Sequence, residues 1–326
     1  MKEALFYEKK ENNSVICNLC PHKCLIKDGK SGICLVRKNI GGTLYAETYN
    51  EITSIAVDPV EKKPLYHFYP GKQILSIGSN GCNMKCFFCQ NWTISMQETE
   101  RKKVNSEALK ELCFLENSIG LAYTYNEPLI QYEFLLDTFE TVSAAGLKNV
   151  LVSNGLIKNE PLKALTRNLD AANIDLKCFN EEFYKEIFGN LKTVKNTISF
   201  LIEKDIHTEI TILIIPGKND SETEFENMCK WMSGMNKSVP LHISRYFPNY
   251  KSDIPPTPLE TIKNLYNIAK IYLHNVYVGN AQIDDTSSSF CPNCGKKIID
   301  RTGYHTKVYL KENRCPYCDS SLYFQL

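Results

Sequence analysis

The sequence has no long hydrophobic run and almost no excess of one charge. No apolar stretch reaches the ~20 residues that a helix needs to cross a bilayer, and the first residues, Met1-Lys2-Glu3, are charged. Lysine and arginine together number 38 against 37 aspartates and glutamates, which gives a formal net charge of +1. This balance argues against nucleic acid or a membrane as partner. We expect a cytoplasmic protein, and its 326 residues suit one catalytic domain with smaller additions.

Cysteine, by contrast, is abundant, with 14 residues in the chain. Eleven of them fall into three groups of four, three and four. In a reducing compartment, clustered cysteines indicate metal sites before they indicate disulfides. The sequence therefore predicts up to three metal centres.

The middle group follows a strand-like segment at 74–78 and has the sequence Gly-Cys-Asn-Met-Lys-Cys-Phe-Phe-Cys-Gln-Asn. Its thiols, Cys82, Cys86 and Cys89, are four and then three residues apart. Three thiolates can hold three corners of a [4Fe–4S] cluster and leave the fourth iron open to a small molecule. A zinc knuckle completed by a distant residue is the alternative.

This stretch resembles the signature of the radical S-adenosylmethionine (SAM) enzymes. The resemblance implies that SAM chelates the open iron through its amino and carboxylate groups and is cleaved by one electron to methionine and a 5′-deoxyadenosyl radical. That radical would abstract hydrogen from a substrate. Phe88, just before the third cysteine, matches the family position that lies against the adenine. An external electron donor such as flavodoxin or ferredoxin is also implied.

The first group, Cys17, Cys20, Cys24 and Cys34, lies within eighteen residues separated by Gly and Pro. Four thiols in this spacing suit a closed site, either structural zinc or an auxiliary Fe–S cluster. Ligand number and type do not separate these two, and we slightly favour zinc. The segment has few apolar runs, so the metal would supply much of its folding free energy.

The third group consists of two Cys-Pro-x-Cys turns with about twenty residues between them. Its thiols are Cys291, Cys294, Cys315 and Cys318. This is the pattern of a zinc ribbon, with a rubredoxin-like iron site as the alternative. A polar run at 284–289 marks a linker before it. We accordingly divide the chain into an N-terminal segment at 1–72, a barrel at 73–283 and a ribbon at 284–326.

Between residue 74 and about residue 280, strand-like runs alternate with helical patterns. The strand-like runs are 74–78, 121–125, 150–153, 172–176, 208–215, 241–244 and 276–278. The helical patterns are 106–117, 128–145, 159–169, 181–188, 193–204, 222–235 and 259–273. Such alternation indicates α/β architecture with parallel strands and crossover helices. Six or seven units are too few for a closed barrel, so we predict a partial (β/α)6 TIM-like barrel of the radical SAM type. Ahead of it, 43–46 and 52–57 are expected to form a hairpin.

Polar residues follow several of these runs, at the strand ends where barrels gather their chemistry. They are Asn126 and Glu127, Ser153 and Asn154, Asp175 and Lys177, and His242. Three of these four groups have an ordinary structural alternative: helix capping for the first pair, an ion pair for Asp175 and Lys177, and a satisfied core histidine for His242.

The radical SAM resemblance gives several of these residues roles around SAM. Asn126 and Glu127 stand in the place of the family's GGE element, which holds the SAM amino group, although both family glycines are replaced. The Asp175-Leu176-Lys177 stretch resembles the DLK of glycyl-radical activating enzymes, in which the lysine meets the SAM carboxylate. By the same resemblance, His242 would lie near the ribose. Ser153 and Asn154 expose polar atoms at the same rim.

A narrower resemblance is carried by residues 58–71, Asp-Pro-Val-Glu-Lys-Lys-Pro-Leu-Tyr-His-Phe-Tyr-Pro-Gly. This sequence is similar to the radical SAM component of the AmmeMemoRadiSam system, and the likeness extends to the C-terminal cysteines. It implies Ammecr-type or Memo-type partner proteins and an undefined reaction. Activation of a glycyl-radical enzyme is the alternative function. A zinc-dependent binding protein without catalysis is a weaker one.

Overall fold

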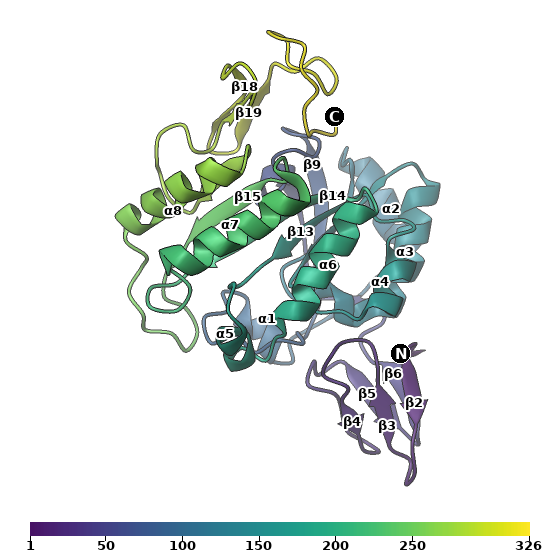
Figure 1. Cartoon of the computed structure of the whole chain (residues 1–326). Helices are drawn as coiled ribbons and strands as arrows, with labels where there is room; N and C mark the ends of the chain where they lie inside the picture. The colour runs from purple at the N-terminus through teal and green to yellow at the C-terminus, as the bar shows by residue number, and fades with distance from the viewer.

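The computed structural model describes residues 1–326, and its centre is an eight-stranded sheet (Figure 1). In sheet order the strands are β8 (Ser54–Pro59), β9 (Gln73–Gly78), β11 (Gly120–Tyr123), β12 (Lys148–Ser153), β13 (Ala171–Asp175), β14 (His207–Ile214), β15 (Leu241–Arg245) and β16 (Val276–Gly279). The seven strands from β9 to β16 are parallel and follow the order of the chain. Their side chains are buried almost throughout, which explains why they appear in the sequence as continuous apolar runs.

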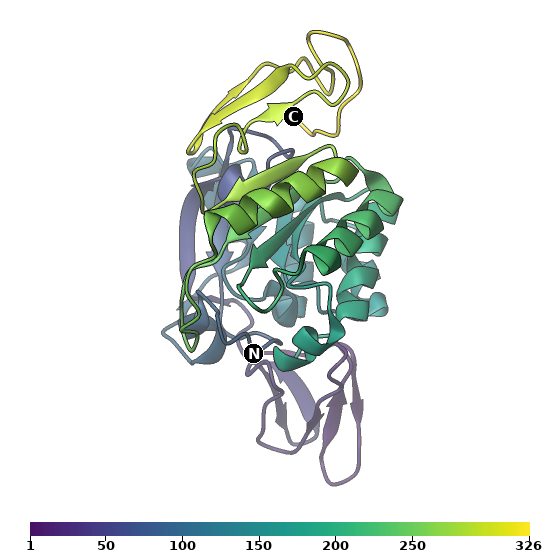
Figure 2. The ribbon, with the colours of Figure 1, turned by 60° about the vertical axis from the view of Figure 1, so that its left-hand side comes forward.

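Helices connect the parallel strands and cover one face of the sheet (Figure 2). They are α2 (Ser106–Leu115), η2 (Pro128–Gln131), α3 (Tyr132–Ala144), α4 (Asn159–Leu165), α5 (Glu181–Glu186), α6 (Leu191–Glu203), α7 (Glu222–Asn236) and α8 (Leu259–Tyr272). Side-chain caps fix several starts: the Asn105 and Asn190 carboxamides accept from Ala108 N and Thr193 N at the beginnings of α2 and α6. The predicted alternation of strands and helices is confirmed.

The sheet ends at β16 on one side and β8 on the other, and these two edges do not pair. It is therefore an open barrel, as predicted. It differs from a six-unit barrel in having seven parallel strands and one antiparallel edge strand, β8.

The predicted hairpin between 43–46 and 52–57 is wrong. β6 (Thr43–Ala46) pairs with β5 (Arg37–Ile40) and β1 (Lys2–Glu3) in a small sheet of the N-terminal segment. β8 pairs instead with β9. Neighbouring strand-like runs in a sequence indicate two strands, but they do not indicate which partner each one takes.

The N-terminal segment contains two three-stranded sheets, the second formed by β2 (Tyr7–Lys9), β3 (Val15–Cys17) and β4 (Leu25–Ile26). Later in the segment, β7 (Glu51–Ile52) pairs with β10 (Lys102–Lys103). The two small sheets lie at the end of the barrel where the parallel strands finish (Figures 1 and 2). A buried ion pair joins the two parts, with Arg37 Nη1 3.0 Å from Glu133 Oε2 on α3. Lys158 N, before α4, also donates to Leu19 O.

The C-terminal ribbon, β17 (Ser289–Phe290), β18 (Lys297–Thr302) and β19 (His305–Val308), lies at the opposite end of the barrel (Figures 1 and 2). The connector between β8 and β9 lies between the ribbon and the barrel. His67 of the connector stacks on Phe324 with ring centroids 3.8 Å apart, and Gln325 N donates to His67 O. Arg301 lies over the Tyr66 ring. Much of the Leu-Tyr-His-Phe sequence therefore serves to hold the ribbon.

None of the helices has both the length and the apolar character that a membrane span requires. No disulfide joins any of the 14 cysteines.

Candidate functional site

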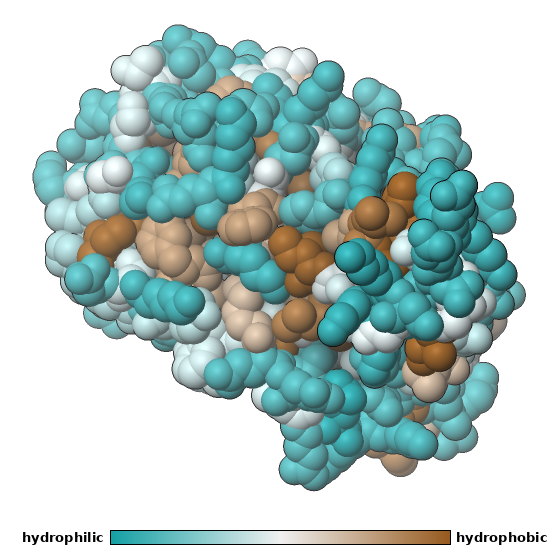
Figure 3. Space-filling view, turned by 90° about the horizontal axis from the view of Figure 1, so that it is seen from below, coloured by the Kyte–Doolittle hydropathy of each residue, from teal (hydrophilic) through white to brown (hydrophobic).

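A large pocket opens at the end of the barrel where the parallel strands finish. It encloses about 1460 Å³ of space between atoms, including its open mouth. Ten of the predicted site residues line it: Cys82, Cys86, Phe88, Cys89, Asn126, Glu127, Ser153, Asn154, Asp175 and Lys177. Seen from below, this end of the molecule shows hydrophobic side chains across the middle of the face and hydrophilic ones around them (Figure 3).

The three-cysteine loop leaves β9 and leads into α1 (Trp92–Met96). Gly81 begins it with a φ of +89°, and a Cβ there would stand 2.3 Å from the Cys34 carbonyl oxygen, so only glycine fits. The Asn126 side chain braces the same turn by accepting from Ser79 N at 2.9 Å and donating to Gly81 O at 2.9 Å. These contacts fix the start of the loop.

The arrangement of the three thiols fits a cluster better than a single ion. No three of the sulfurs in this loop lie within 4.8 Å of one another, a closeness that the ligands of one zinc ion require. All three nevertheless line one pocket, and no fourth cysteine lines it. This donor set suits a [4Fe–4S] cluster with one iron free of protein ligands.

Glu127 connects the ends of β11 and β12. Its Oε1 accepts from Ser153 Oγ at 2.7 Å and from Leu129 N at 3.0 Å, and its Oε2 accepts from Asn154 N at 2.8 Å. Burial nevertheless raises the pKa of Glu127 to about 7, because these hydrogen bonds only partly offset desolvation. The hydrogen bond from Leu129 N caps the start of η2, so Glu127 both caps this short helix and lines the pocket.

Asp175 and Lys177 form an ion pair with Nζ 2.8 Å from Oδ2, and both line the pocket. Burial alone would lower the pKa of Lys177, but the charges of Asp175 and the Cys86 thiolate raise it above its usual value. Asn219 fixes the backbone here by donating to Lys177 O at 2.7 Å. Asp175 and Lys177 therefore form an ion pair and also line the pocket, so the two roles considered for them do not exclude each other.

The structure does not bring His242 to the pocket. Its Nε2 lies 2.6 Å from Glu209 Oε2 in the buried end of the barrel, beside Tyr66 of the connector. Ser244, two residues later on the same face of β15, lines the pocket instead. Alternation along the strand predicted that His242 and Ser244 share a face, but it did not predict how deep each one lies. Because His242 does not line the pocket, the structure lends no support to its expected place near a ribose.

Sequence reasoning missed a charged group formed by the connector. Asp58, at the end of β8, accepts from Lys62 at 2.8 Å, from buried Lys63 at 2.6 Å and from the Tyr125 hydroxyl at 2.7 Å. Burial would raise the pKa of Asp58, but these donors hold it well below its ordinary value. Lys62, Lys63 and Tyr125 all line the pocket. Two adjacent lysines before a proline were the available signal.

The four ribbon cysteines converge. Their sulfurs all lie within 4.8 Å of one another, with Cys291 and Cys318 3.6 Å apart and Cys294 and Cys315 3.7 Å apart. This geometry fits a tetrahedral metal site such as zinc, whose Zn–S bonds are about 2.3 Å long.

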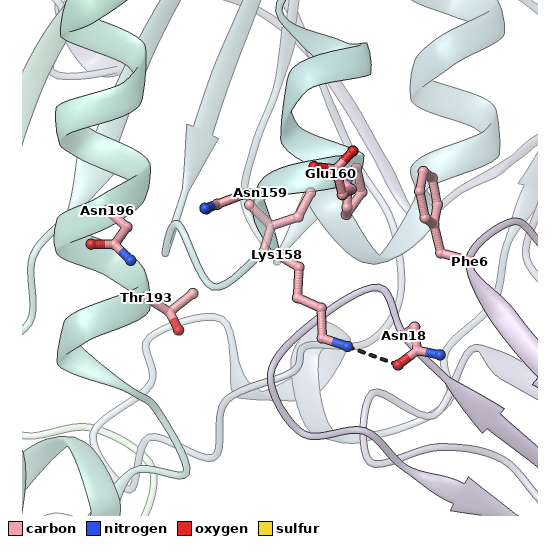
Figure 4. Close-up of a pocket in the computed structure, with 9 residues that line it drawn as sticks. Phe6, Asn18, Lys158, Asn159, Glu160, Thr193 and Asn196 are labelled. Carbon is pink, nitrogen blue, oxygen red and sulfur yellow. Dashed lines mark hydrogen bonds between the residues drawn. The ribbon is translucent and has the colours of Figure 1, made fainter.

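A second surface pocket lies between the N-terminal segment and helices α4 and α6 (Figure 4). Its lining is mostly polar, and Lys158 Nζ donates to Asn18 Oδ1 across it at 2.8 Å. It contains none of the predicted cofactor residues. We therefore place the chemistry in the pocket of the three-cysteine loop.

Comparison with known proteins indicates the family to which the chain belongs. Residues 76–231 match the model of the radical SAM superfamily. An uncharacterised protein of Methanocaldococcus jannaschii is 40% identical over 332 residues, covering 99% of both chains. The pyruvate formate-lyase 1-activating enzyme of Escherichia coli is 24% identical over 60% of this chain and 88% of its own length.

Among solved structures, Streptococcus suis SuiB bound to S-adenosylmethionine superposes with a TM-score of 0.50 and 13% identity. The match covers 64% of this chain and 52% of that one, and it shows a shared fold. With the three-cysteine loop at the end of its parallel sheet, the chain belongs to the radical SAM superfamily, whose members are enzymes.

Proposed function

We propose that this protein binds SAM at the three-cysteine loop and cleaves it reductively to start a radical reaction on a substrate in the same pocket. The observation that carries the proposal is the convergence of exactly three cysteines with Glu127, Asp175 and Lys177 around one pocket. A [4Fe–4S] cluster held there would supply the electron that converts SAM to methionine and a 5′-deoxyadenosyl radical.

The chain's own residues would bind and orient SAM. Glu127 offers a buried carboxylate to the ammonium group, and Lys177 offers a cation to the carboxylate. Phe88, 4% exposed, gives a flat apolar surface for the adenine. The remaining wall, which includes Lys62, Lys63 and Ser244, would face the substrate.

Two proposals for the substrate follow from different observations. The motif at 58–71 forms part of the pocket wall, which favours the AmmeMemoRadiSam reaction with Ammecr-type or Memo-type partners. The similarity to the E. coli activating enzyme favours a glycyl-radical enzyme as substrate. Either reaction would take its electron from a donor such as flavodoxin or ferredoxin. Cysteines that form no disulfide suit the reducing cytoplasm that we propose as the location. Zinc in the C-terminal ribbon completes the proposed set of cofactors.

The test is an anaerobic assay of the reconstituted protein with SAM and dithionite, in which 5′-deoxyadenosine and bound iron are measured. We expect the parent protein to form deoxyadenosine and Cys86→Ala to form none. The matched control is Cys229→Ala, a buried thiol on α7 away from the pocket, which should keep the activity.

Equal deoxyadenosine formation by the parent and Cys86→Ala would refute the proposal. So would an iron-loaded, reducible parent that forms none even with its physiological donor, a result that would favour the non-catalytic binding protein.

A further inference from the structure

The four N-terminal cysteines surround a pocket of their own. Cys17, Cys20, Cys24 and Cys34 line about 290 Å³ of space between atoms, together with apolar side chains such as Leu19 and Ile130. Three of the four cysteines are buried, and Cys24 is half-buried. The sulfurs therefore face a space that is largely closed to water.

The separation of these sulfurs distinguishes between the two metals that four thiols allow. A zinc ion with Zn–S bonds of about 2.3 Å draws its four sulfurs to within about 4 Å of one another. The ribbon cysteines meet that requirement. No three of the N-terminal sulfurs come within 4.8 Å of one another, and in this they resemble the catalytic loop. A cubane cluster binds each thiolate at a different iron and so spreads them apart.

The pocket also contains a donor without a partner. Arg37 lines it, is 1% exposed and uses its terminal nitrogens on Glu133 and Leu5 O. Its Nε is buried and has no hydrogen-bond partner. A buried N–H is costly to leave unpaired, and a thiolate or sulfide sulfur in the pocket would accept from it.

The same cysteines lie directly against the catalytic loop. Gly81 packs on the Cys34 carbonyl, and His22 Nε2 is 2.7 Å from Asn83 O. Asn83 lines the N-terminal pocket, while Cys82, its neighbour in the chain, lines the catalytic one. Asn154 contacts both residues, through Asn83 Oδ1 at 2.9 Å and Cys82 Sγ at 3.7 Å.

We propose that Cys17, Cys20, Cys24 and Cys34 hold a second [4Fe–4S] cluster, which passes reducing electrons to the catalytic cluster. The separation of these four sulfurs favours a cluster, whereas the sequence alone slightly favoured zinc. The electron-transfer role rests on the function proposed above. One electron leaves the reduced auxiliary cluster and enters the oxidised catalytic cluster, and a low-potential flavin or iron–sulfur protein restores it.

The first experiment separates the auxiliary site from the catalytic one. The variant Cys82→Ala/Cys86→Ala/Cys89→Ala, which keeps the N-terminal cysteines, is reconstituted anaerobically, and its iron, sulfide and zinc are counted. We expect about four irons and four sulfides per chain and the electron paramagnetic resonance signal of a reduced cubane, with about one zinc in the ribbon. Absence of iron together with about two zincs per chain would overturn the proposal.

The second experiment measures electron storage in the parent protein. The protein is fully reduced, freed of excess reductant and mixed with SAM, and deoxyadenosine is counted. Each cleavage consumes one electron, so an auxiliary cluster that passes its electron on gives about two deoxyadenosines per chain, a twofold excess over a single cluster. About one per chain would refute the electron-transfer role. Failure to cleave SAM would refute the proposed function and the electron route with it, while the iron count would still decide whether the cluster exists.

Discussion

At the scale of single residues, Glu127 combines a structural role with a place in the catalytic pocket. It is buried, accepts three hydrogen bonds and faces the pocket in which we place SAM. Burial raises its pKa to about 7, so the folded protein stabilises the charged carboxylate only weakly, and a bound ammonium group would favour that charged form.

Glu127→Gln tests this position. In the variant, an NH2 group would replace one of the two carboxylate oxygens and would face a hydrogen-bond donor. That donor is Asn154 N if Oε2 is replaced, or Leu129 N and Ser153 Oγ if Oε1 is replaced. Hydrogen bonds to charged groups contribute about 1.5–3 kcal/mol, which corresponds to a roughly 10- to 100-fold loss of deoxyadenosine formation. The iron content should stay unchanged, and the exposed Glu160→Gln is the control. Unchanged activity in Glu127→Gln would show that this carboxylate does not bind SAM.

At the scale of elements, the connector between β8 and β9 contributes both to the catalytic pocket and to the contact with the ribbon. Its Lys62 and Lys63 line the catalytic pocket, and its His67 is buried beneath the ribbon. Glu209 on β14 holds the connector by accepting from His67 N at 2.7 Å and Tyr66 N at 3.0 Å. One short segment therefore positions part of the pocket and the ribbon.

His67 makes this contact sensitive to acid. Burial lowers its pKa from 6.5 to about 3, so the unfolded state binds more protons than the folded state between these values. Neutral His67 therefore makes its full contribution to the free energy of unfolding above pH 6.5. This contribution falls by about 1.4 kcal/mol per pH unit as the pH decreases toward 3. We expect the free energy of unfolding, measured by denaturant unfolding, to decrease by about 2 kcal/mol between pH 6.5 and 5.

His67→Gln provides the comparison, since glutamine does not titrate. The variant should be less stable at pH 7 but should lose less stability between pH 6.5 and 5 than the parent. Glu209, whose pKa is lowered, acts in a separate window below its ordinary value of 4.5. Parallel pH profiles of parent and variant would contradict the assignment to His67.

The elements differ in how far the sequence predicts them. The parallel strands and their helices were predictable, because a strand buried on both faces is an apolar run and a covering helix has period 3.6. The partner of β8 was not, since strand pairing depends on residues distant in the chain. The cysteine groups were found from local spacing, whereas the depth of His242 in the barrel and the Asp58 group depend on tertiary packing.

At the scale of the whole molecule, two cysteine-rich parts lie at opposite ends of one barrel (Figures 1 and 2). The N-terminal segment contacts the catalytic loop, whereas the ribbon packs on the end where the parallel strands begin, through residues such as Tyr323 at Thr208. We therefore expect the two proposed metal sites, one in the N-terminal segment and one in the ribbon, to act independently. A disturbance of the ribbon should reach the barrel as lost stability and should not reach the catalytic loop.

Removal of the ribbon metal tests that separation. Cys294→Ser/Cys318→Ser leaves two of the four ligands, so we expect the loss of about one zinc per chain and a ribbon that is cut readily by protease. The melting temperature should fall by several degrees, because an unfolded ribbon no longer covers His67 and Phe68. Iron content and deoxyadenosine formation at 25 °C should equal those of the parent, with Cys113→Ser, a buried thiol of α2, as the control for a cysteine substitution as such. Loss of iron in the ribbon variant would mean that the connector transmits the state of the ribbon to the catalytic pocket, since Lys62 and Lys63 of the same segment line that pocket.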